Sequence, residues 1–162
     1  MPSAPAAQTT DARAAGSQAW VRLLRAHAAA TRALNARLLH EHGLTVNDYE
    51  ALLLLADAEE HSLRRTDLAR SLELTASGVT RLLDGLETAG LVAKATCARD
   101  ARVSYAVLTE AGRERLADAS RSYDAALAEL FAGYGADELD TLAELLGRLP
   151  GATRIGCPLG GG

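Results

Sequence analysis

The segment "TCARDARVSY", residues 96 to 105, places a thiol, a carboxylate and two guanidinium groups between two apolar runs. Cys97 close to Arg99 is a pattern found in oxidation-sensitive thiols, so redox sensing is one interpretation. Asp100 and Arg102 allow a second, because an arginine can contact a polyanion while a neighbouring carboxylate holds it in place. The third is a solvated hairpin tip whose Asp–Arg pair contributes little to stability. The structure predicted on either side of the segment is needed to choose among these three interpretations.

Other catalytic or metal-binding patterns are sparse. The four histidines form no HExxH motif, and no Gly-x-Ser-x-Gly or phosphate-binding glycine loop occurs. His40 and His42 flank Glu41, but their side chains point in different directions at a helix end. Cys97 and Cys157 have neither metal-knuckle nor disulfide-framework spacing, which fits a reducing compartment. We therefore expect no enzyme activity, no catalytic residues, no cofactor and no metal site.

Composition indicates one soluble domain with a mainly aliphatic core, since 48% of the 162 residues are hydrophobic and only six are aromatic. The longest apolar stretch, "ALLLLADA", falls far short of the ~20 residues that cross a bilayer, and no secretory leader is evident, so we expect a cytoplasmic protein. The net charge of −4 argues against indiscriminate nucleic-acid binding. The segment 61–105 nevertheless carries +2, and the remainder carries −6.

Helical periodicity dominates between a lead expected to be disordered (1–16) and a flexible tail (150–162). A first helix is predicted at about 17–42, ending near Gly43, with His27 inside its apolar stripe and more readily a core histidine than a ligand contact. A second is predicted at about 46–57, where Thr45 and Asp48 resemble a capping box. The segment "RRTDLARSLEL" predicts a short third helix whose inward residues are Leu68, Ala69 and Leu72.

The fourth predicted helix, from Thr75 to Thr88, has one apolar and one polar face. The apolar stripe is formed by Val79, Leu82, Leu83 and Leu86. The outer face contains Ser77, Thr80, Arg81, Asp84 and Thr88. Small hydroxyl side chains with one arginine suit a helix that enters the DNA major groove, and Gly78 indicates close approach to another group. The alternative is a solvated polar face with a glycine tolerated near a frayed end.

Two β-prone runs, 91–96 and 102–108, follow this helix and predict a hairpin with "CARDA" at its tip. Helix, turn, helix and hairpin is the order of a winged helix-turn-helix, in which the hairpin is the wing. In that arrangement Arg99 and Arg102 meet phosphate or a minor groove, and Asp100 holds one of them. The fold class is thus mainly α with a small β-hairpin wing, flanked by N- and C-terminal dimerisation helices.

The stretch "LARSLELTASGVTRLLDGLETAGLVAKATCARDARVSYAVLTEAG" resembles the core of the MarR family of transcriptional regulators. Its marks are Asp100 and Arg102 in the wing, followed by the Leu-Thr-x-x-Gly of Leu108, Thr109 and Gly112. The resemblance implies a homodimer that binds a pseudo-palindromic operator in double-stranded DNA, usually as a repressor, and leaves it when a small phenolic or lipophilic effector binds. It does not imply a redox role for Cys97, because the peroxide-sensing branch places its reactive cysteine in the first helix.

The expected site residues follow from the helix, the wing and the resemblance. The predicted DNA-binding residues are Thr75, Ser77, Gly78, Thr80, Arg81, Lys94, Arg99, Asp100 and Arg102. The predicted effector-pocket residues, taken from the family's use of its first two helices, are Trp20, His27, Arg37 and Tyr49. Cys97 remains a candidate redox residue.

Apolar stripes in the last two predicted helices, about 110–132 and 136–149, exceed what a 45-residue winged unit can bury, so they predict a dimer. The alternative is intramolecular packing of the first, fifth and sixth helices. We expect a single domain over 17–149, with the winged unit at 46–108 and dimerisation helices at 17–42 and 110–149. A winged-helix module that binds a protein partner and no DNA is the competing functional interpretation, although the fourth helix shows no large apolar residue on its outer face.

Overall fold

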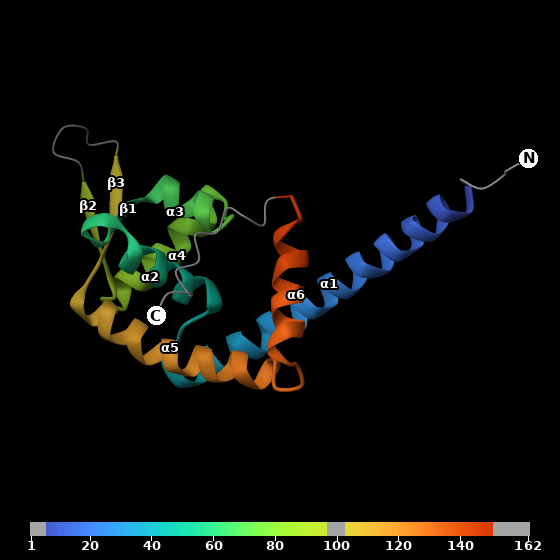
Figure 1. Ribbon diagram of the computed structural model, residues 1–162. Coiled ribbons are helices and arrows are strands. Elements are labelled where there is room, and N and C mark those ends of the chain that lie inside the picture. The colour runs from blue at the N-terminus through green and yellow to red at the C-terminus, as the bar shows by residue number, and fades with distance from the viewer. Residues whose placement is uncertain (1–5, 97–102, 151–162) are drawn as a thin grey trace, which may run out of the picture.

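The computed structural model describes residues 6–96 and 103–150, and Figure 1 shows a helical protein with a small sheet at one end. The helices are α1 (Ala6–His42), α2 (Val46–Asp57), α3 (Arg65–Ser71), α4 (Ala76–Thr88), α5 (Glu110–Leu130) and α6 (Ala136–Gly147). A 3₁₀ turn, η1 (Glu59–His61), leads into the strand β1 (Ser62–Arg64), and the hairpin consists of β2 (Val92–Thr96) and β3 (Ser104–Leu108). The predicted fold class is confirmed.

Helix α1 is longer than predicted. It begins at Ala6, inside the lead that was expected to be disordered, and residues 6–16 are rich in alanine, the best helix former. Its N-terminal half projects away from the rest of the chain (Figure 1), and Trp20 and Leu24 are exposed there. His27 is exposed as well, so its prediction as a core histidine is wrong, because this half of α1 meets no core of its own chain. The helix ends before Gly43, whose φ of +68° favours glycine.

The predicted capping box of α2 is present. Thr45 accepts a hydrogen bond from the Asp48 amide at 3.1 Å, and its own amide donates to Asp48 Oδ2 at 2.8 Å. The inner face of the helix then supplies the centre of the core through Tyr49, Leu52 and Leu55, each at most 1% exposed. The core around them joins the end of α1 to the winged unit and to α5.

Helices α3 and α4 form the helix-turn-helix. Leu68 of α3 is fully buried, and α4 buries Val79, Leu83 and Leu86, with Leu82 partly buried beside them. Thr75 caps α4 by accepting a hydrogen bond from the Gly78 amide at 3.1 Å. The apolar stripe of α4 therefore fixes which side of the helix faces outward.

The sheet has three antiparallel strands in the order β1-β3-β2. The hairpin pairs Val92 with Leu108 and Thr96 with Ser104, as the two β-prone runs predicted. The strand β1 was not predicted, and it pairs Leu63 with Ala106 on the other edge of β3. This pairing connects the entry to α3 directly with the wing.

The start of α5 is docked on the turn between α4 and β2. The Thr109 hydroxyl donates to Gly90 O at 2.7 Å and accepts from the Gly112 amide, while the Thr109 amide donates to Leu91 O at 3.1 Å. A Cβ added at Gly112 would lie 2.1 Å from Leu91 O, so only glycine allows this approach. The Leu-Thr-x-x-Gly motif thus fixes α5 to the winged unit.

Helix α5 packs along α1 and α2, but α6 packs closely on no other element that the structure describes. All of its residues except the half-buried Leu139 are exposed, including Leu142, Leu145 and Leu146. Intramolecular packing of the first, fifth and sixth helices was the alternative to dimerisation. Of these three helices, only α1 and α5 pack closely on each other.

Candidate DNA interface and effector groove

The outer face of α4 presents a narrow polar stripe. Ser77, Arg81, Asp84 and Thr88 follow one another at steps of four, three and four residues, which places them in one line along the helix. All four are exposed, and so is Thr80 beside them. The stripe lies opposite the buried Val79, Leu83 and Leu86, so the predicted partition of this helix is confirmed.

The hydroxyl groups of this face are partly engaged with the helix itself. Thr80 donates to Ala76 O at 2.8 Å, and Thr88 donates to Asp84 O at 2.7 Å. Thr75 Oγ1 lies 3.2 Å from Ser77 Oγ while capping Gly78. These hydroxyls can still accept hydrogen bonds, but their capacity to donate is reduced.

Gly78 has a local explanation. An added Cβ would lie 3.1 Å from Thr75 Oγ1, tighter than ordinary van der Waals contact. The glycine therefore makes room for the cap of α4, and close approach of a ligand is not needed to account for it. Arg81, in contrast, is exposed and makes no ion pair with any residue that the structure describes.

The wing presents Lys94 on β2, exposed together with Ala93, Ala95 and Thr96. Arg99, Asp100, Arg102 and Cys97 lie outside the described residues. The pairing of β1 with β3 places Arg64 beside Tyr105, and neither residue was among the predicted site residues. Arg64 Nε donates a hydrogen bond to the Tyr105 hydroxyl at 3.3 Å. The Arg64 guanidinium also lies 6.0 Å from the centroid of the Tyr105 ring. Their pairing was not readable from sequence, because they are 41 positions apart and β1 was not predicted.

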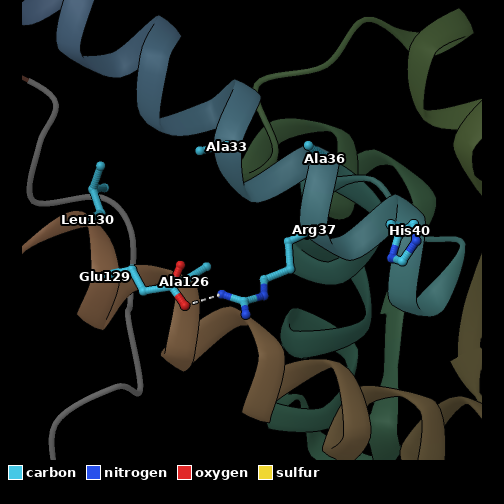
Figure 2. Close-up of a pocket in the computed structure, with 7 residues that line it drawn as sticks. All are labelled: Ala33, Ala36, Arg37, His40, Ala126, Glu129 and Leu130. Atoms are coloured by element: carbon cyan, nitrogen blue, oxygen red, sulfur yellow. Dashed lines mark hydrogen bonds and ion pairs between the residues drawn. The ribbon is translucent and has the colours of Figure 1, made fainter.

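A groove of about 530 Å³ runs between α1 and α5 (Figure 2). Its walls are mostly small and apolar, and its lining residues are Ala33, Ala36, Arg37, His40, Ala126, Glu129 and Leu130. Arg37 and Glu129 meet across it at 2.9 Å, as the dashed line in Figure 2 shows.

The polar side of the groove continues into a chain of hydrogen bonds between α1 and α5. Arg37 also pairs with Glu41 at 3.1 Å, and Ser122 donates to Glu41 while its oxygen lies 2.8 Å from His42 Nε2. The hydrogen bond from Ser122 and then the one from Arg37 lower the pKa of the Glu41 carboxyl. Hydrogen bonds to Glu129 and Glu41 raise the pKa of Arg37, which therefore keeps its charge.

The four predicted pocket residues do not gather in one place within this chain. Tyr49 is 1% exposed, stacks on Tyr123 with ring centroids 4.5 Å apart, and lies within hydrogen-bond distance of Ser120. Arg37 lines the groove, but Trp20 is seventeen residues earlier on α1, about 25 Å along the helix axis. Trp20 and His27 are both exposed.

Within the described residues, no three His, Cys, Asp or Glu side chains are grouped so as to hold a metal ion. Over the same residues, no helix has both the length and the apolar character to cross a membrane.

The helix-turn-helix with a three-stranded wing defines a winged-helix protein. The model of the MarR family matches residues 42–103, which contain the whole helix-turn-helix and the first strand of the hairpin, β2, and end just before β3. The chain is also 30% identical to AbsC, a MarR family transcriptional regulator from Streptomyces coelicolor, over 80% of this chain and 88% of that one, with a TM-score of 0.72. The chain belongs to the MarR family.

Other relatives add detail. The transcriptional repressor YetL of Bacillus subtilis is 32% identical over 107 residues, which span 66% of this chain and only 64% of that protein. Sco3205 from Streptomyces coelicolor, solved in complex with DNA, is 25% identical with a TM-score of 0.74, over 80% of this chain and 82% of that one. CouR from Rhodococcus jostii RHA1, solved with p-coumaroyl-CoA, is 28% identical with a TM-score of 0.67, over 77% and 86%.

Proposed function

We propose that this chain is a sequence-specific transcriptional repressor in the cytoplasm, which binds a palindromic operator as a homodimer and leaves it when a small molecule binds. The observation that carries the proposal is the outer face of α4, where Arg81 is exposed, forms no ion pair with any of the described residues and lies among short polar side chains. The DNA complex of Sco3205 and the repressor YetL support it as relatives.

Arg81 is the residue best suited to read a base. An arginine bonds O6 and N7 of guanine with two parallel hydrogen bonds, which requires a guanidinium that no acidic neighbour already occupies. Ser77 lies one turn before Arg81, towards the N-terminus of α4, where recognition helices contact base edges. Lys94 and the wing arginines then contact the backbone, which positions the protein without reading sequence.

DNA binding of this kind predicts a salt dependence that can be measured before any operator is known. Fluorescence anisotropy of a labelled random-sequence duplex, titrated at several salt concentrations, should give a linear fall of log affinity with log salt. Absence of binding at low salt, by protein that is folded, would contradict the proposal and favour a module that binds protein.

Dimerisation is supported by the exposed apolar residues on the two terminal helices. These are Trp20, Val21 and Leu24 on α1, Leu142, Leu145 and Leu146 on α6, and Leu149 just beyond it. A single-chain protein seldom leaves so many large apolar side chains exposed on neighbouring turns. Leu145→Asp should convert the dimer to monomer in sedimentation, whereas Asp140→Asn on the same helix should leave it unchanged. A monomeric wild-type protein would contradict this part of the proposal.

The effector site is proposed to be the groove between α1 and α5, because Arg37 and Glu129 offer polar contacts beside an apolar wall. A ligand that separates Arg37 from Glu129 breaks an ion pair between α1 and α5, the two helices that connect the proposed dimer interface with the winged unit. Phenol and p-coumaroyl-CoA, the ligand of CouR, are the first probes. Either probe should release bound DNA from wild-type protein but not from Ala36→Trp. Release that persists in Ala36→Trp would mean that the effector binds elsewhere.

A further inference from the structure

An acidic side chain stands in the middle of the outer stripe of α4. Asp84 is seven residues beyond Ser77 and three beyond Arg81, and its side chain is 63% exposed. The seven-residue step is about 10 Å along the helix, comparable with the ~12 Å width of the major groove. A helix that places Arg81 against base edges therefore places Asp84 in the same groove.

A carboxylate in that position is repelled by phosphates unless a cation lies beside it. Arg65, the first residue of α3, supplies the cation, with Nη2 3.8 Å from Asp84 Oδ1. The Arg65 side chain is only 20% exposed, and its Nη2 is buried with no hydrogen-bond partner among the described residues. A buried guanidinium nitrogen left unpaired is costly, so a small rotation of the exposed carboxylate towards Arg65 is favourable.

We propose that Asp84 is a specificity-determining residue of the DNA interface and that Arg65 is the positioning residue that orients it. With Oδ1 directed to Arg65, Oδ2 is left to accept a hydrogen bond in the major groove. The inference rests on the proposed function, and it adds which base pair the protein requires at one position of each half-site.

The chemistry of the base edges selects the partner. An ionised carboxylate only accepts hydrogen bonds, so the acceptor edges of guanine and thymine repel it. Adenine N6 lies between two acceptors in the major groove, its own N7 and the O4 of the paired thymine, whereas cytosine N4 has an acceptor on one side only, the O6 of the paired guanine. Asp84 therefore selects a C·G pair in each half-site.

The test is selection of bound sequences from a random duplex pool by three proteins at one fixed salt concentration. Wild-type protein should require cytosine at one position of each half-site. Asp84→Asn should relax this requirement about tenfold and shift the position towards adenine, because asparagine bonds adenine N6 and N7 together. Glu87→Gln removes the same charge from the same helix outside the stripe, and it should leave the preference unchanged.

A fourth protein tests the positioning role. Arg65→Gln should weaken the cytosine preference at the same position and leave the salt dependence of affinity unchanged, since no phosphate contact is lost. The inference is overturned if Asp84→Asn tightens binding to all sequences as much as Glu87→Gln does, for then Asp84 is a bystander charge. Enrichment of no sequence by wild-type protein would instead contradict the proposed function itself.

Discussion

Replacement of Gly112 by alanine tests the docking of α5 on the winged unit. The new Cβ would lie 2.1 Å from Leu91 O and 2.8 Å from Leu108 Cδ1, so the helix start has to move outward by more than 1 Å. Thr109 moves outward with the helix start, so its hydrogen bonds to Leu91 O and Gly90 O are weakened. Overpacking of ~1–3 kcal/mol, with weakening of two hydrogen bonds worth ~1 kcal/mol each, gives a loss of about 3 kcal/mol in the free energy of unfolding.

Urea unfolding followed by circular dichroism measures this loss. With a slope of ~2 kcal/mol per molar urea, the midpoint should fall by about 1.5 M. Protein concentration must be held fixed, because dimerisation adds to apparent stability. Gly85→Ala in α4 is the matched control, since its Cβ would meet nothing within 4 Å, and it should gain ~0.5–1 kcal/mol. A Gly112→Ala midpoint equal to that of wild type would refute the close docking of α5.

Three further substitutions address charge and DNA contact. Burial raises the pKa of the Glu50 carboxyl, against an opposing effect of His27, so ionised Glu50 destabilises the folded state. Glu50→Gln should thus raise the free energy of unfolding at pH 7, with the gain disappearing below the ordinary glutamate pKa of ~4.3; equal gains at pH 7 and 3.5 would contradict this. Arg81→Ala should cost ~1–3 kcal/mol of binding and relax preference at one base pair per half-site, whereas a uniform loss across sequences would make Arg81 a phosphate contact. Arg102→Ala should weaken binding to all sequences alike and reduce the salt slope by about 1; an unchanged slope would count against the wing assignment.

Local signals in the sequence were sufficient for the helix-turn-helix. The Thr45 cap and the apolar stripe of α4 depend on residues within a few positions of one another, and the structure confirms them. The polar outer face of α4, and hence the candidate interface, was readable for the same reason.

Features that depend on distant residues were not readable. The strand β1 has three residues and no alternation of its own, and it exists because β3 offers an edge more than forty positions later. Arg37 and Glu129 are 92 positions apart, so their meeting across the groove required the crossing of α1 and α5. His27 was misplaced because helical periodicity indicates an apolar face but not whether its own chain or another covers that face.

Selection of bound sequences from a random duplex pool by wild-type protein, under reducing conditions and near physiological salt, tests the central claim most directly. A two-fold dimer with one α4 helix per protomer predicts an inverted repeat whose half-site centres lie one helical turn, ~34 Å, or a multiple of it apart. Recovery of such a repeat would support both the DNA interface and the dimer. Enrichment of no sequence by protein that is folded and dimeric would contradict the account.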